Sequence, residues 1–377
     1  MLLNLPNNDF RSALKTLAPI SPNNPYIPST SHVLFDSTMD GTVQMTATDT
    51  QIWVQYQLPE QALDAGQCTA PASRMKSLSE LIPRDSCVRI EREDEGVVAI
   101  SFGKAKARLF TYDTREFPTI PNRAVCAPFT IPSKQFIAAV HAVTPCMCRD
   151  KLRFQLCGLR VEAHGGELVF IATDGRRMSV CTVEAEMPKE LVVAATIPAR
   201  AINVALHYAA LGPDVMLDFS KTHCYFACGP VWLMCALTDG TFPDYKKLIP
   251  MERHTQVLTF DLAEFKSAMR RVVALSGRDA PAVVVQVTPD YEYAVISCNA
   301  KNEGSSVEQV GVEQVGVDEP LRFSINPAYV LDSLGSIGTE KVVLRIKDPS
   351  SAIFVLENYP DTSHKAVNLS LIMPIRT

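Results

Sequence analysis

The chain has 377 residues, 47% of them hydrophobic, and a formal net charge of −5 at pH 7. No apolar run approaches the ~18 residues that a membrane-spanning helix needs. The N-terminus MLLNLPNNDFRSALK has neither the basic start nor the small-residue cleavage site of a secretory signal. We therefore expect a cytoplasmic protein without a membrane partner, whose eleven cysteines are reduced thiols.

In chain order, the first predicted element is a short apolar strand followed by an amphipathic helix, and this pair recurs twice. The aromatic landmarks Phe10, Phe136 and Phe265 lie roughly 125 residues apart, each followed by apolar side chains at helical spacing. A second helix pattern follows each of these, and Pro71 and Pro198 stand where its strand gives way to the helix. The six expected helices cover residues 8–17, 72–81, 133–143, 199–208, 263–273 and 327–335.

Other landmarks repeat at the same interval. ATDT begins at Ala47, ATDG at Ala172 and CNAK at Cys298, and the closing motifs REFPTIP, GTFPDYKKLIP and LIMPIRT end the three copies. We predict three homologous domains, at residues 1–125, 126–252 and 253–377, near the usual size of a single domain. The joints at 124–128 and 250–254 are short, so the domains are expected to hold fixed positions.

Between the helices the sequence alternates with the period of two that is typical of strands, as at 224–237, 342–346 and 352–356. The near-duplicate SVEQVGVEQVGVDE (306–319) favours strands around a turn, with a disordered acidic loop as the alternative. Adjacent strands with few crossover helices indicate mainly antiparallel sheets. We therefore predict an α+β fold in which each domain is a doubled unit of one helix plus strands, with the helices gathered on one side.

The predicted helices carry an excess of positive charge in an acidic chain. They contain four acidic residues against nine basic ones, namely Arg11, Lys15, Arg74, Lys76, Lys134, Arg200, Lys266, Arg270 and Arg271. Such an asymmetry is typical of a surface that faces phosphates, although helices tolerate Lys and Arg in any case. The sequence has no zinc-finger, basic-zipper or ribonucleoprotein signature, so the expected contacts to nucleic acid are independent of base sequence.

Three motifs carry a resemblance to a known family. ATDGRRMSV (172–180), TFPDYKKLIP (241–250) and the terminal MPIRT (373–377) resemble the bacterial DNA polymerase III beta subunit, the ring-shaped sliding clamps. The resemblance spans the whole chain. It implies a head-to-tail homodimer that closes into a ring with helices inside and sheets outside. It also implies a protein without catalytic activity that slides on duplex DNA and tethers polymerases.

The resemblance further implies a hydrophobic cleft between the second and third domains. In the family this cleft receives a short peptide from the catalytic subunit of DNA polymerase III, the clamp loader and other proteins with a clamp-binding motif. The matching positions are Leu156, Thr173, Gly175, Arg176, Arg177, Met178, Pro243, Lys247, Leu248, Asn326, Tyr329, Ser351, Leu371, Ile372, Met373, Pro374, Ile375 and Arg376. Of these, Leu156, Met178, Leu248, Ile372 and Met373 are expected to hold apolar peptide side chains. Arg149 and Lys151, on the loop before Leu156, join the candidates for DNA contact.

The chain departs from the family pattern at several positions. Arg176 stands where His is usual, Lys247 replaces a frequent Arg, and Thr377 ends the chain where an apolar residue is common. A DNA-touching loop of the first domain, which often has Arg before Pro, here reads Asn23-Asn24-Pro25. These changes suggest an altered peptide preference. They leave open a clamp-fold paralogue that binds or regulates partners without encircling DNA.

Signals for enzyme chemistry are weak. The pairs Cys146/Cys148 and Cys224/Cys228 have no second CxxC or HxxxH to complete four zinc ligands, so buried structural thiols are expected and no metal. Asp49 and Asp174 are interpreted as turn residues, not catalytic carboxylates. No P-loop is present, and no nucleotide cofactor is predicted. A thiol hydrolase or metalloenzyme is a third hypothesis.

Overall fold

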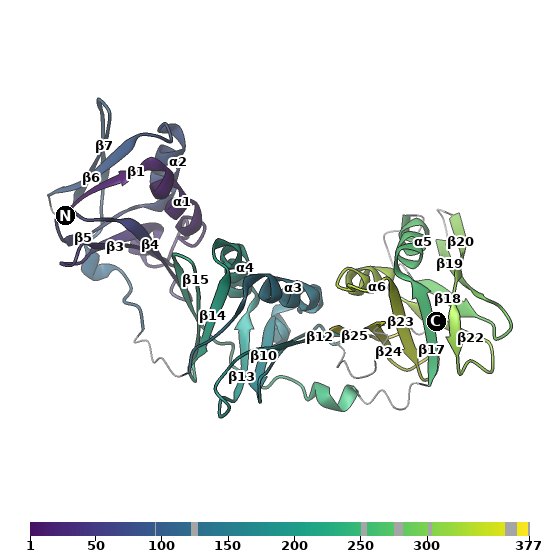
Figure 1. Ribbon diagram of the computed structural model, residues 1–377. Coiled ribbons are helices and arrows are strands. Elements are labelled where there is room, and N and C mark those ends of the chain that lie inside the picture. The colour runs from purple at the N-terminus through teal and green to yellow at the C-terminus, as the bar shows by residue number, and fades with distance from the viewer. Residues whose placement is uncertain are drawn as a thin grey trace. The chain divides into compact units, whose positions relative to one another are not determined.

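The computed structural model describes residues 1–94, 96–121, 127–249, 255–274, 282–300, 304–358 and 368–375 (Figure 1). Most of the two predicted joints, 122–126 and 250–254, lies outside the described residues. The described part contains six α-helices, each at a predicted position: α1 (Asn7–Leu17), α2 (Ala72–Leu81), α3 (Ser133–Val143), α4 (Ala199–Tyr208), α5 (Leu262–Ala274) and α6 (Pro327–Leu334). None of these helices is long and apolar enough to cross a bilayer.

The chain forms two compact units. The first comprises Met1–Lys134, Glu186–Pro188 and Arg200–Leu237, and the second comprises Gln135–Ala185, Lys189–Ala199 and Thr238–Thr377. Each unit therefore combines one outer predicted domain with half of the middle one. The division into three domains stays a prediction from the repeat.

The first unit contains two antiparallel sheets. One has the order β1 (Leu2–Pro6), β6 (Cys87–Asp94), β7 (Val97–Phe102), β8 (Ala105–Phe110). The other has the order β5 (Gly66–Pro71), β2 (His32–Ser37), β3 (Thr42–Thr48), β4 (Ile52–Gln61), β16 (Val231–Ala236), β15 (His223–Cys228), β14 (Asp214–Phe219), β9 (Phe129–Pro132). In this larger sheet β4 pairs with β16, with Val54 opposite Leu233, so the sheet runs on from one sequence repeat into the next.

The second unit has the same plan. Its larger sheet has the order β13 (Val193–Pro198), β10 (Gly158–His164), β11 (Glu167–Thr173), β12 (Arg177–Glu184), β25 (Asn368–Ile372), β24 (Ile353–Glu357), β23 (Lys341–Ile346), β17 (Gln256–Asp261), β21 (Glu313–Val315). Its smaller sheet has the order β20 (Gly304–Gly311), β19 (Tyr293–Ala300), β18 (Val283–Val287), β22 (Leu321–Ile325). The β12–β25 pair is the counterpart of β4–β16 and again joins two repeats.

The repeat is visible in how the helices are buried. Helix α1 buries Phe10, Ala13, Leu14 and Leu17, and α5 buries Phe265, Ala268, Met269 and Val272 at the same spacing. These i, i+3, i+4, i+7 positions form one face of a helix, and that face packs on the sheets. Helix α1 contacts strands of both sheets of its unit and also α2, while α5 contacts β17, β19, β20 and α6.

The segment 306–319 forms strands, as its valine alternation indicates, but the strands do not pair with each other. Strand β20 pairs with β19 in the smaller sheet and β21 with β17 in the larger one. Val310 and Val312, on either side of Gly311, are both buried in the same core cluster. The expected strands are present, and the chain changes sheets between them.

Candidate partner-binding site

The β12–β25 pair brings the motif ATDGRRM together with the C-terminal segment. Arg177 lies opposite Ile372 and Met178 opposite Leu371 in the strand register. Beyond the strand, the backbone N–H of Met373 donates to the carbonyl oxygen of Arg176 at 2.9 Å. The predicted cleft residues of the ATDGRRM motif and those of the C-terminal segment, which are far apart in sequence, are therefore brought together by the pairing of β12 with β25.

The turn before β12 is built by Asp174. Its Oδ1 accepts from the backbone N–H groups of Arg176 at 2.9 Å and Arg177 at 3.0 Å, which confirms the predicted turn role. Gly175 has φ +84°, and a Cβ there would lie 3.0 Å from Nη1 of Arg153. In the first unit Asp49 caps the equivalent turn through the N–H groups of Gln51 and Ile52.

The apolar residues predicted for the cleft fall into two groups. Leu156, Met178, Leu371 and Ile372 are buried. The first three belong to a core cluster that includes Phe354 and Phe242. Leu248, Met373 and Ile375 are 55%, 43% and 37% exposed. The structure therefore makes the buried residues part of the protein core, and only the second group offers apolar surface to a partner.

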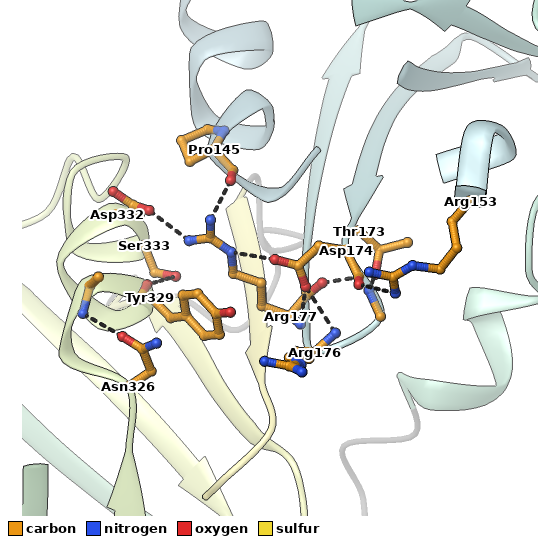
Figure 2. A network of polar contacts seen from close by, with 12 residues as sticks. Pro145, Arg153, Thr173, Asp174, Arg176, Arg177, Asn326, Tyr329, Asp332 and Ser333 are labelled. Atoms are coloured by element: carbon orange, nitrogen blue, oxygen red, sulfur yellow. Dashed lines mark hydrogen bonds and ion pairs between the residues drawn. The ribbon is translucent and has the colours of Figure 1, made fainter. Parts of the chain in front are cut away.

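Arg177 is the most heavily bonded residue of the predicted set (Figure 2). Its Nε donates to Asp174 Oδ2 at 3.0 Å, its Nη1 to Asp332 Oδ2 at 2.6 Å and its Nη2 to the carbonyl oxygen of Pro145 at 2.5 Å. The guanidinium also lies 4.2 Å from the centre of the Tyr329 ring. Desolvation lowers the pKa of Arg177, but the bonds to Asp332 and Asp174 outweigh it and raise the net pKa.

Arg176 differs from its neighbour. Its side chain is exposed and makes no hydrogen bond or ion pair with any described residue, whereas Arg177 bonds both Asp174 and Asp332. Arg153 donates from Nη1 to the Asp174 carbonyl oxygen at 2.7 Å and from Nε to Asp150 at 3.3 Å. A full positive charge thus stands free beside the exposed Met373.

The remaining candidate cleft residues include Asn326 at the N-terminal end of α6 and Ser351 before β24. Asn326 caps α6 by accepting from the N–H of Ala328 at 2.9 Å. Ser351 lies two residues before Ile353, which pairs with Ile372, and its hydroxyl donates to Asp348. Hydrogen bonds from Ser351 and Ser350 lower the pKa of Asp348 to about 2.

The segment 243–248 is held on the same cluster through buried Tyr245. Pro243 is exposed, and the exposed Lys247 pairs with Asp244 at 2.9 Å. Pro374 is half-buried, Thr173 accepts from the N–H of Gly175 at 3.1 Å, and Arg376 lies outside the described residues.

Most side chains of the candidate DNA-binding cations form no ion pair or hydrogen bond with another described residue. Arg200 forms an ion pair with Asp49, and Arg271 pairs with Glu308 through two bonds of 2.8 and 2.9 Å. Lys266 donates to the Leu334 carbonyl oxygen at 3.5 Å. In the described part of the chain no such partner contacts the side chains of Arg11, Lys15, Arg74, Lys76, Lys134, Arg149, Lys151 and Arg270.

The cysteines are placed as structural thiols. Cys146, Cys148, Cys224 and Cys228 are all buried and free, as predicted, and burial raises the pKa of Cys146 to about 12. A thiol with so high a pKa is not a nucleophile at neutral pH. Over the described ranges no three His, Cys, Asp or Glu side chains cluster as metal ligands would.

Comparison with known proteins identifies the family of this chain. Models of the DNA polymerase III beta subunit match twice in succession, the central domain at residues 130–244 and the C-terminal domain at 246–376. The chain belongs to the DNA polymerase III beta subunit family. The beta sliding clamp of Pseudomonas aeruginosa is 26% identical over 336 residues, 89% of each chain.

Solved clamp structures agree in fold over the full length. The crystal structure of the DNA polymerase III subunit beta from P. aeruginosa has a TM-score of 0.91 at 24% identity and covers 100% of both chains. The beta sliding clamp of Caulobacter crescentus has a TM-score of 0.92 at 23% identity and covers 100% of this chain and 99% of that one. The predicted family and α+β fold are thereby confirmed.

For this member of the beta subunit family, the sequence did not predict the polar partners of the candidate cleft residues. Asp332, Pro145 and Arg153 were not among the candidates, although they hold the β11–β12 turn and Arg177 in place. Asp332 is separated from Arg177 by 155 positions, so no local pattern announces the pair. Its place on α6, three residues after Tyr329 and hence on a neighbouring position of the helix surface, was the available signal.

Proposed function

We propose that this chain is a DNA sliding clamp, a non-enzymatic processivity factor of replication that encircles duplex DNA and tethers DNA polymerase. The observation that carries the proposal is the full-length match to clamp structures, at a TM-score of 0.91 over 100% of both chains. The repeat, the free helix cations and the joined cleft motifs add independent support. We place the protein in the cytoplasm, where the chromosome of a bacterium is replicated.

Two sheet edges that have no neighbouring strand among the described residues suit a head-to-tail homodimer. Strand β8 ends one smaller sheet and β20 ends the other. Phe110 on β8, Val307 on β20 and Leu81 at the end of α2 are large apolar side chains that are mostly exposed. An unpaired edge with apolar side chains is a template for another strand. Because the two edges differ, pairing β8 of one copy with β20 of the next is a heterologous contact, which gives a ring when the rotation closes.

The helix cations suit a channel that holds DNA without reading its sequence. Contacts from Lys and Arg to phosphate carry no base information, and a protein with weak contacts of this kind slides easily. The Arg200 and Arg271 side chains are about half exposed, and the Arg271–Glu308 pair contributes little to stability. Arg271 can therefore exchange its carboxylate for a phosphate at small cost, whereas Arg200 would leave the Asp49 carboxylate, which is 7% exposed, with only its backbone donors.

The cleft suits short peptides from the catalytic subunit of DNA polymerase III, the clamp loader and other clamp-binding proteins. Met373, Ile375 and Leu248 supply the exposed apolar contacts, and the flexible Met side chain adapts to varied guests. The uncompensated charge of Arg176, where the family usually has His, is expected to shift the peptide preference of this clamp. Ordinary clamp peptides should bind it less tightly than they bind clamps with His at this position.

Removing residues 373–377 tests the cleft assignment. The truncated protein should lose binding of a fluorescein-labelled hexapeptide with leucine and phenylalanine anchors, because the exposed Met373 and Ile375 are gone. Its dimer, measured by sedimentation velocity, should persist, because β8 and β20 are untouched. Loss of the dimer in this variant, or unchanged peptide binding, would contradict the assignment.

A further inference from the structure

The guanidinium of Arg177 is largely enclosed by contacts within the protein. Three of its five N–H donors are used, one each on Nε, Nη1 and Nη2, at distances of 2.5 to 3.0 Å, and its side chain is only 12% exposed. One face of the guanidinium lies against Tyr329 at 4.2 Å. The low exposure of the side chain leaves little of the guanidinium open to a peptide carboxylate. The residue is therefore built into the protein framework.

The Tyr329 ring is held between two supports. It packs against the core cluster of α5 and the smaller sheet of the second unit, and it also meets the Arg177 guanidinium. The backbone around it is fixed because Asn326 caps α6 and Ser333 donates to the Tyr329 carbonyl oxygen at 3.0 Å. Figure 2 shows Arg177 reaching from the β12 strand to Asp332 and Tyr329 on α6. Since Asp332 anchors Arg177, it also fixes the support under the ring.

The first unit has a matching contact at its own strand joint. There the Asp49 turn, equivalent to the Asp174 turn, forms an ion pair with Arg200 at the start of α4. In both units an ion pair therefore connects the turn at the start of the strand that joins two repeats (β4 or β12) to the second helix of the following repeat (α4 or α6). The charges are reversed between the units: in the first unit Asp49 of the turn pairs with Arg200 of α4, and in the second Arg177 beside the turn pairs with Asp332 of α6. An ion pair of this kind is thus a recurring element of the β4–β16 and β12–β25 strand pairs.

We propose that Asp332 and Arg177 are positioning residues of the cleft, which hold the Tyr329 ring for a partner peptide without contacting the peptide themselves. This inference rests on the proposed function. It removes Arg177 from the predicted peptide contacts and leaves Arg176 as the cation that meets the partner. It also assigns a role to Asp332, which no motif indicated.

The test is peptide affinity in Asp332→Asn, measured by fluorescence anisotropy with the labelled leucine–phenylalanine hexapeptide. Loss of one charge-assisted bond beneath the ring should raise the Kd about fivefold. Asp332→Glu, which restores the charge, should recover most of the affinity. Asp318→Asn, an exposed acidic residue of the same unit with no partner among the described residues, is the charge-matched control and should not change the Kd.

A double-mutant cycle separates positioning from a general structural role. If Asp332 acts through Tyr329, then Asp332→Asn should have no further effect in a Tyr329→Ala background. An equal loss in both backgrounds, or an unchanged Kd in Asp332→Asn alone, overturns the inference while leaving the cleft in place. Absence of hexapeptide binding by the unmodified protein overturns the cleft assignment and this role together.

Discussion

The division of the cleft residues into core and surface makes a quantitative prediction for Leu371→Ala. Leu371 is 4% exposed and lies between Met178 on β12 and Phe354 on β24. Truncating a buried leucine to alanine costs about 2–5 kcal/mol, because both the transfer free energy and the packing around the new cavity are lost. For a unit of this size each kcal/mol lowers the Tm by about 2–4 °C. We expect the second unit to melt about 4–20 °C earlier.

The chain allows this unit to be followed separately. Both tryptophans, Trp53 and Trp232, belong to the first unit, so their fluorescence reports that unit alone. Differential scanning calorimetry should show the shifted transition in Leu371→Ala, while the tryptophan transition stays in place. The matched variant Met373→Ala removes a side chain that is 43% exposed, so it should change the Tm by less than about 1 °C and instead weaken binding of the labelled hexapeptide. An unmoved calorimetric transition in Leu371→Ala, or a large destabilisation by Met373→Ala, would refute the division.

Three further predictions concern the first unit and DNA. Burial lowers the pKa of His32 from 6.5 to about 4, so the unfolded chain binds the extra proton between these values. Stability of the first unit should fall by about 2 kcal/mol as the pH drops from 6.5 to 4, and a His32→Phe variant followed by tryptophan fluorescence should lack this dependence. Tyr208→Phe removes the buried hydroxyl that donates to the Thr16 carbonyl oxygen, and it should cost about 1–3 kcal/mol. Tyr26→Phe, at a fully exposed tyrosine, should cost nothing measurable in the same urea titration. Affinity for a duplex of arbitrary sequence should fall roughly tenfold or more between about 50 and 200 mM salt; a salt-independent affinity would exclude phosphate contacts as its source.

The sequence predicted the repeating elements because their signals are local. Phe10, Phe136 and Phe265 each head an apolar face with helical spacing, and the helices are found where that spacing places them. Asp49 and Asp174 were recognisable as turn residues, because the side chain of an Asp accepts from N–H groups two and three residues ahead.

Other features depend on tertiary structure and have no local signal. Met178 and Met373 are the same residue type in two of the family motifs, but Met178 is buried opposite Leu371 of β25, whereas Met373 is exposed. The change of sheet between β20 and β21 accompanies the burial of Val310 and Val312 in one core cluster, and periodicity alone does not specify it. The Asp332–Arg177 ion pair is the clearest example, because its two residues are brought together only when strands β12 and β25 pair.

Topological retention on DNA tests the central claim most directly. The protein is loaded by a cognate clamp loader onto a nicked circular plasmid and separated from free protein by gel filtration, and the plasmid is then cut once. A closed ring that holds duplex by enclosure should stay on the circle at high salt and leave after linearisation. Equal loss from circular and linear DNA would contradict encirclement and favour a clamp-fold protein that binds its partners without surrounding DNA.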